Sequence, residues 1–169
     1  MSDSSARSAF GSSKIEFLIL DKYKGKLSGC TLVTGFYGIG KVGFISVNHM
    51  VEKLGAERIG AILSDFLPPF LSVKNDNLVL PFEIYKYQDI IFLSAFFEPY
   101  KYEHRSFARA LVKWAKKNEL SHSILIGGLD SRLKTEDELL AKGVYSSKFK
   151  EKFKSLPVPI MDEGLFITG

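Results

Sequence analysis

Apolar residues fall into short runs along the chain, and charged residues or glycines separate one run from the next. Short apolar runs bounded by turn-forming residues are typical of strands that lie buried in a sheet. Polar turns are expected at residues 21–26 and 74–77, where charged residues and asparagines interrupt the runs. The pattern predicts strands at residues 15–20, 30–34, 59–63, 70–73, 78–85, 89–96, 123–126 and 158–161.

Other segments repeat their apolar residues at the spacing of a helix. One helix is expected to start near residue 43 and to end before Gly55, because glycine is favoured directly after a helix. Its buried face comprises Gly43, Val47, Met50, Val51 and Leu54. The clearest helix covers residues 104–117, and residues 135–142 and 147–154 are also predicted to be helical. The apolar side of the helix at residues 104–117 comprises Phe107, Leu111, Trp114 and Ala115. Its basic side comprises Arg105, Arg109, Lys113 and Lys116.

Strands thus alternate with helices around one meander, which predicts an α/β fold with a mixed sheet in a three-layer α/β/α sandwich. The 169 residues suit one domain. Residues 1–13 are rich in serine and are interpreted as a flexible leader before a single domain at residues 14–169. No run reaches the roughly 18 apolar residues of a membrane span. The leader lacks the apolar core of a signal peptide, so the cytoplasm is the expected location.

The charge is distributed unevenly. The chain carries a formal charge of +4, and residues 101–154 contain 13 Lys and Arg against 7 Asp and Glu. These charges are spread over expected helices without interleaved aromatic residues, so a solvated face is favoured over nucleic-acid binding. The 14 Phe and 7 Tyr favour association with a partner, since such rings are enriched at interfaces.

Residues 35–43, GFYGIGKVG, nearly match two nucleotide-binding motifs. The P-loop motif lacks its last residue, because Val42 stands where a hydroxyl would hold Mg²⁺. The dinucleotide motif is preceded by a strand and followed by a helix, with Asp65 near the position of a ribose-binding acid. A meander follows Asp65, however, where a Rossmann half needs a second crossover helix and a parallel strand. The alternative hypothesis is therefore an enzyme or binding protein for a nucleotide or nucleoside that uses the loop of residues 35–43.

The preferred interpretation of these glycines is structural. Gly43 would let its helix pack closely on the sheet, and Gly35, Gly38 and Gly40 would permit tight or left-handed backbone. Phe36, Tyr37 and Ile39 would then form an exposed apolar tip. We expect an interaction loop consisting of Gly35, Phe36, Tyr37, Gly38, Ile39, Gly40 and Lys41. A second apolar segment, kept out of regular structure by its prolines, consists of Phe66, Leu67, Pro68, Pro69 and Phe70. A homo-oligomer held by these surfaces is expected.

No catalytic, cofactor-binding or metal-binding residues are predicted. The three histidines are scattered, and Cys30 lacks a second cysteine at metal-ligand spacing. Glu98, Glu103 and His104 lie close together in the sequence and could form an acid–base set. We expect them to face solvent instead, because no nucleophile accompanies them.

Several short motifs in order resemble the proteasome assembly chaperone 2 family. They are GFYGIGKVG, the helix end EKLGAERIG, SDFLPP, IGGLDSR, VYS and LPVPIMDEG. The resemblance runs from about residue 14 to residue 169 and implies a three-layer fold similar to nucleoside phosphorylases, with no established catalytic site. It also implies a chaperone that helps proteasome α-subunits to assemble and that self-associates.

The chain departs from this family at its end. Some members finish with a hydrophobic–Tyr–any tail that docks between α-subunits, whereas this chain ends in Phe-Ile-Thr-Gly169. Members usually continue beyond the equivalent of Glu163 and Gly164, so the chain is expected to lack the family's C-terminal extension. Proteasome binding through such a tail is therefore not expected of this chain.

Overall fold

The computed structural model describes residues 14–67, 72–74, 77–129, 141–146, 149 and 158–161. It divides into two compact units, Met1–Gly128 together with Gly169, and Leu129–Thr168. The leader expected at residues 1–13 lies outside the described residues, and a single domain over residues 14–169 stays a prediction.

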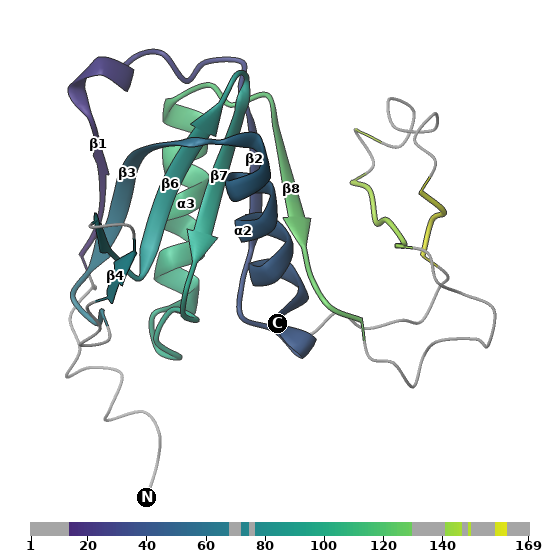
Figure 1. Cartoon of the computed structure of the whole chain (residues 1–169). Coiled ribbons are helices and arrows are strands. Elements are labelled where there is room, and N and C mark those ends of the chain that lie inside the picture. The colour runs from purple at the N-terminus through teal and green to yellow at the C-terminus, as the bar shows by residue number, and fades with distance from the viewer. Residues whose placement is uncertain are drawn as a thin grey trace, which may run out of the picture. The chain divides into compact units, whose positions relative to one another are not determined.

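The first unit is built on a six-stranded mixed sheet with the strand order β1-β3-β6-β7-β2-β8 (Figure 1). Strand β2 is parallel to both of its neighbours, β7 and β8, whereas β1, β3, β6 and β7 form a run of antiparallel pairs. The strands are β1 (Ile15–Ile19), β2 (Thr31–Gly35), β3 (Glu57–Ser64), β6 (Phe82–Tyr87), β7 (Ile90–Ala95) and β8 (His122–Ile126). The predicted mixed α/β fold and its meander are therefore confirmed.

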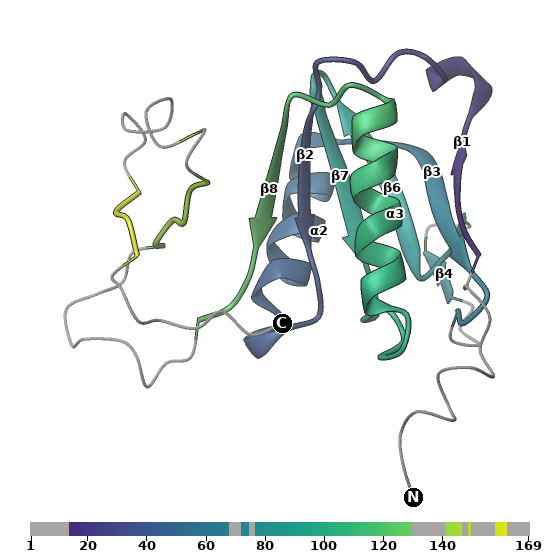
Figure 2. The same cartoon turned by 180° about the vertical axis from the view of Figure 1, so that it is seen from behind.

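One helix covers each face of this sheet, as the two opposite views show (Figures 1 and 2). Helix α2 (Val42–Leu54) contributes Val47 and Val51 to a core with Val33 and Phe92. Helix α3 (His104–Lys117) buries Phe107 and Trp114 in a larger core on the other face. There the Trp114 ring stacks on Phe17 at a centroid distance of 4.9 Å. The three-layer arrangement is confirmed, whereas similarity to nucleoside phosphorylases stays a prediction.

The remaining elements are short. Two 3₁₀ turns, η1 (Asp21–Tyr23) and η2 (Ile39–Lys41), lie in the loops that precede β2 and α2. Strands β4 (Ser72–Lys74) and β5 (Asn77–Val79) pair as a separate antiparallel hairpin. The single strand expected at residues 78–85 is therefore wrong, since Leu80 and Pro81 separate β5 from β6.

The expectation that the first strand is buried is also wrong. Strand β1 lies at the edge of the sheet, and Leu18 keeps 49% of its surface exposed. In the second unit, the strand expected at residues 158–161 is reduced to one bridge between Gly143 and Ile160. The helices expected at residues 135–142 and 147–154 lie almost wholly outside the described residues, and Ala141 and Lys142, which are described, are not helical.

One buried carboxylate was not anticipated from the sequence. Glu83 on β6 is fully buried and pairs with the Arg58 guanidinium at 2.9 Å. It also accepts a hydrogen bond from the Tyr85 hydroxyl at 2.6 Å and from the Leu80 backbone N–H at 3.2 Å. Burial, together with the Glu83 carboxylate, raises the pKa of Tyr85 well above its usual value. The buried charge is tolerated because these partners satisfy it.

Helix α2 approaches the sheet closely because two glycines face one another. A Cβ atom added at Gly43 would lie 2.9 Å from the Gly35 Cα, and one added at Gly35 would lie 2.6 Å from the Gly43 Cα. Real Cβ atoms do not approach backbone so closely, so only glycine fits either position. Gly55, with φ of 62°, ends the helix in the left-handed conformation. The predicted packing role of Gly43 is confirmed.

We therefore expect Gly43→Ala to lower the free energy of unfolding by about 1–3 kcal/mol, because the added methyl group must push α2 away from β2. The sign is informative, since alanine normally stabilises a helix by about 1 kcal/mol relative to glycine. Urea unfolding would measure the change. Gly127→Ala is the matched control, because a Cβ there meets no atom within 4 Å. Equal stability of Gly43→Ala and the wild type would contradict this account.

Candidate interaction site

The two segments singled out in the sequence meet at one edge of the sheet. Strands β2, β3, β7 and β8 run in the same direction, so their carboxyl ends share an edge, at the bottom of Figure 1. The loops that leave this edge include residues 36–41 after β2, residues 65–67 after β3 and residues 96–103 after β7. Ligands of open α/β sheets commonly bind outside such carboxyl ends.

Backbone geometry makes the loop of residues 36–41 compact. Gly40 and Lys41 both adopt left-handed conformations, with φ of 63° and 56°. Gly38 has φ of −89° and is not left-handed, contrary to one of the options given for it. A Cβ added at Gly128, just after β8, would lie 2.9 Å from the carbonyl carbon of Ile39. Backbone contacts to α2 and to the end of β8 thus hold this loop from two sides.

The side chains of this loop do not form the uniform apolar tip that was expected. Phe36 turns inward and meets Phe107 of α3 edge-on at 6.1 Å, so its predicted exposure is wrong. Tyr37 is half-buried and packs on Phe44 at 4.8 Å. Ile39 remains 40% exposed. The Lys41 ammonium lies 4.7 Å from the centre of the Tyr37 ring, where a cation–π contact stabilises it.

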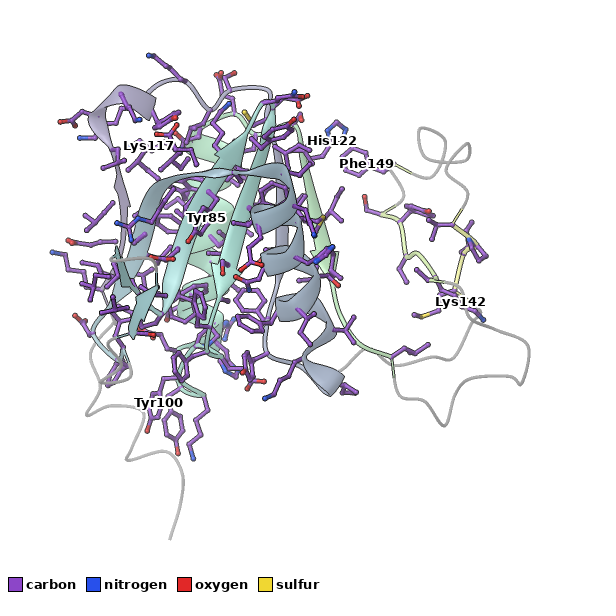
Figure 3. The ribbon with its side chains drawn as sticks, viewed as in Figure 1. Tyr85, Tyr100, Lys117, His122, Lys142 and Phe149 are labelled. Atoms are coloured by element: carbon purple, nitrogen blue, oxygen red, sulfur yellow. The ribbon has the colours of Figure 1, made fainter. Side chains whose placement is uncertain are left out.

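The second apolar segment contributes its first two residues to the described structure. Phe66 stacks on Tyr100 with ring centroids 5.3 Å apart, and Leu67 packs against the core beneath α3. Pro68, Pro69 and Phe70 lie outside the described residues. Tyr100 in turn meets Tyr102 at 5.5 Å, and both tyrosines are exposed, at 42% and 52%. Figure 3 shows Tyr100 projecting beyond the edge where the strands end.

These rings line an open groove of about 400 Å³. We call it the aromatic groove, and its lining residues are Tyr37, Phe66, Phe97, Glu98 and Tyr100. The sequence identified the segments that carry Tyr37 and Phe66. It did not single out Phe97 and Tyr100, although the run FFEPYKY at residues 96–102 is unusually rich in aromatic residues. Four of these five residues are aromatic, and Glu98 supplies the one carboxylate among the lining residues.

A buried hydrogen-bond network holds the groove from beneath, and we call it the Ser64–Glu103 network. Glu103 is 2% exposed, so the expectation that it faces solvent is wrong. Its carboxylate accepts a hydrogen bond from the Ser64 hydroxyl at 2.5 Å, and its backbone N–H donates to the Tyr100 carbonyl at 2.7 Å. The Ser64 oxygen accepts the Phe66 N–H at 3.1 Å. The network thus links the backbones that carry the stacked rings.

The geometry does not assemble an acid–base set from Glu98, Glu103 and His104. Glu98 and His104 are exposed, whereas Glu103 is buried and engaged with Ser64. A ring nitrogen of His104 lies 2.6 Å from the Pro99 carbonyl oxygen. Among the residues that the structure describes, no three His, Cys, Asp or Glu side chains group as metal ligands would. No helix within that same part of the chain is long and apolar enough to cross a membrane.

The nucleotide motifs acquire other roles in the fold. Gly35 and Gly43 are occupied by the contact between α2 and β2, and Lys41 lies on the Tyr37 ring. Asp65 accepts a hydrogen bond from the Lys14 backbone N–H at 2.7 Å. After α2 the chain enters β3, which β7 and β6 separate from β2, rather than a strand beside β2. A Rossmann unit would place the two strands side by side.

We expect Ser64→Ala to lower the free energy of unfolding by about 1–3 kcal/mol, because it removes partners from a buried carboxylate and from the Phe66 N–H. Ser28→Ala is the matched control, since Ser28 donates to the exposed Glu119 at 3.0 Å and its loss costs little. Thermal unfolding would compare the two variants. NMR spectra should show increased motion of the Phe66 ring only in Ser64→Ala, and equal effects in both variants would refute the role of the network.

The fold of this chain is similar to solved structures of archaeal proteins, at low sequence identity. Pyrococcus furiosus PbaA, an archaeal homolog of proteasome-assembly chaperone, matches with 21% identity and a TM-score of 0.75 over 90% of this chain and 66% of PbaA. A Thermoplasma acidophilum protein of unknown function matches with 17% identity and a TM-score of 0.67 over 88% and 62% of the two chains. The chain therefore spans slightly less than two thirds of the length of these two relatives.

A third structure, the archaeal proteasome activator PbaB of Pyrococcus furiosus, matches with 17% identity and a TM-score of 0.59 over 95% of this chain and 72% of PbaB. At these identities the likeness establishes a shared fold. No curated protein matches the sequence. The family model described as the PAC2 family matches residues 32–169, which include both candidate segments, α3 and the second unit. The chain belongs to the PAC2 family.

Proposed function

We propose that this protein is a non-catalytic interaction module that assists proteasome assembly, working in the cytoplasm without a cofactor. One structural observation carries the proposal: an exposed aromatic groove lies at the carboxyl edge of the sheet, and one of its rings, Tyr37, is carried by a loop that backbone contacts fix. Family membership supports it, as do the names of two relatives, a homolog of proteasome-assembly chaperone and a proteasome activator.

The groove has the composition of a protein-binding surface. Tyr and Phe are enriched where proteins meet, and an exposed cluster of rings usually marks such a site. Covering one ring of this size stabilises a complex by about 1.5–3 kcal/mol before the costs of association. Because the loop that carries Tyr37 is held by α2 and β8, this loop loses little conformational entropy when a partner binds.

We propose two partners for this edge: proteasome α-subunits and a second copy of the chain. The proposed interaction surface combines the groove with the exposed residues Ile39 and Lys41 of the neighbouring loop. Closed symmetric assemblies are the commonest form of self-association, so we expect a discrete homo-oligomer. The proposal does not use the C-terminal tail.

The second candidate function is binding of a nucleoside or nucleotide at the Gly35–Gly43 loop. The position of the groove favours it, since ligands of α/β sheets bind at carboxyl ends, and Phe66 or Tyr100 would offer a ring for stacking. Val42 provides no hydroxyl for Mg²⁺, and the Glu98 carboxylate would repel a phosphate. We therefore place this candidate second.

We expect the wild-type protein to sediment as a discrete oligomer and to retain proteasome α-subunits in a pull-down. Tyr37→Glu combined with Ile39→Glu should shift it toward the monomer and weaken retention by at least about tenfold, because two charges would be buried. Leu18→Glu combined with Leu20→Glu is the control, since these leucines are exposed, at 49% and 50%, and Leu18 lies on the edge strand β1, away from the loop that follows β2. A monomeric wild type at high micromolar concentration would refute self-association, and failure to retain α-subunits would refute the proteasome partner.

Calorimetry with ATP and Mg²⁺, NAD and adenosine separates the two candidate functions. We expect no binding in the low micromolar range, because the glycines are engaged in packing and Lys41 in its contact with Tyr37. Saturable binding that is lost in Lys41→Ala but kept in Lys53→Ala, where an exposed lysine lies at the far end of α2, would establish the second candidate instead.

A further inference from the structure

The outward face of α3 carries a dense line of positive charge. Arg105, Arg109, Lys113 and Lys116 follow one another at helical spacing, and all four side chains are exposed. The sequence of α3, HRSFARALVKWAKK, contains no acidic residue. The salt bridges found within the described part of the chain involve Lys14, Lys22, Lys24 and Arg58, and none of the α3 cations. This face therefore holds four cations whose charge no described carboxylate offsets in an ion pair.

An apolar hollow interrupts this line of charge. A depression of about 470 Å³ is lined by Ala108, Val112 and three of the cations, Arg109, Lys113 and Lys116. Ala108 is small and lies one turn before Val112, so the longer side chains rise around these two positions. Val112 keeps 54% of its surface exposed, although the apolar residues of an amphipathic helix normally face the core. In Figure 2 this helix stands in front of the sheet.

We propose that this face of α3, which we call the basic face, binds an acidic segment of a partner protein that inserts one apolar side chain between its carboxylates. The four cations extend over twelve residues, which is about 17 Å along a helix axis. That length matches about three turns of a partner helix or five residues of an extended strand. The apolar side chain would cover Ala108 and Val112, while flanking Asp or Glu residues pair with the surrounding cations.

The composition of the face favours a protein segment over nucleic acid. Phosphate backbones would use the cations but would leave Val112 uncovered, and the basic face has no aromatic ring on which a base could stack. A second copy of the chain is disfavoured, because two basic faces would repel one another and the chain as a whole carries a charge of +4. Charge complementarity therefore selects an acidic amphipathic segment.

This inference goes beyond the proposed proteasome function and uses a different surface. The aromatic groove is formed by loops at the carboxyl edge, whereas the hollow is lined by residues of α3 alone. Variants of one surface leave the other intact, so the two proposals can fail separately.

Fluorescence anisotropy with labelled synthetic peptides and the full chain tests the inference. The first probe is a helical peptide with one central leucine and glutamates on either side; the second replaces this leucine by asparagine. A third probe is a duplex DNA of 20 base pairs. We expect the leucine peptide to bind at least about tenfold more tightly than the asparagine peptide, because only the leucine covers the hollow. Its affinity should fall as salt increases.

Paired charge reversals decide whether the basic face is responsible. Arg109→Glu with Lys113→Glu should weaken binding of the leucine peptide by at least about tenfold. Lys26→Glu with Lys53→Glu changes the net charge equally at exposed positions elsewhere, and should weaken it by less than about threefold. Val112→Asn keeps every charge and should remove the preference for the leucine peptide. Circular dichroism confirms folding, and Arg109→Gln with Lys113→Gln serves where the reversal unfolds the chain.

Three results would overturn the inference. They are equal weakening by both pairs of reversals, unchanged peptide preference in Val112→Asn, and binding of the duplex at least as tight as that of the leucine peptide. The last result would instead assign this face to nucleic acid.

Discussion

The backbone contact between Gly43 and Gly35 is the constraint on which the rest of this structure depends. It brings the first turn of α2 against the end of β2, and no side chain separates the two elements. The loop between them has few residues in which to turn, so Gly40 and Lys41 take left-handed conformations. Gly40 adopts this conformation without strain, and the strain at Lys41 is tolerated because the helix, the strand and the end of β8 all hold the loop. A more distant helix would release the loop and lose the platform for Tyr37.

The same glycines explain why the sequence resembles nucleotide-binding motifs. Phosphate loops use glycine so that a ligand can approach the backbone, and here another backbone occupies that space. Both situations demand glycine, the residue without a Cβ, at similar spacing after a strand. The motif therefore indicates that some group approaches the backbone closely. Val42 and the strand order indicate that this group is another backbone segment and not a phosphate. The chemistry at the last motif position is more informative than the glycines that precede it.

Periodicity predicted most elements of the first unit, because each has one apolar face that a single core covers. Helix α3 was obtained with its correct bounds, since its apolar and basic sides alternate without interruption. The strand at residues 78–85 was not, because Leu80 and Pro81 are compatible with an extended run yet break the ladder. Burial of β1 was overestimated for a related reason: an apolar run is compatible with an edge strand, and only pairing partners identify the edge.

Polar residues inside the fold were the least predictable. Glu103 was expected to face solvent and Glu83 is a single charge within an apolar run, and each is buried because partners from distant segments reach it. Local pattern carries no record of such partners: Ser64 lies 39 residues before Glu103, and Arg58 lies 25 residues before Glu83. For the same reason, the sequence predicted only two of the four rings that line the aromatic groove. Tyr37 and Phe66 belong to conspicuous segments, whereas Phe97 and Tyr100 join them only through the order of the strands.

The two exposed surfaces of the first unit differ in the physical basis of recognition. The aromatic groove offers rings held by buried hydrogen bonds, so a partner gains mainly from covering apolar area. The basic face of α3 offers charge on flexible side chains, so a partner gains mainly in rate of encounter and in selectivity, and loses both as salt increases. Under the proposed function, the two surfaces would act at different stages of binding. Long-range electrostatic attraction to the basic face would bring an acidic segment of the partner close first. Short-range apolar contacts in the aromatic groove would then hold a complementary surface.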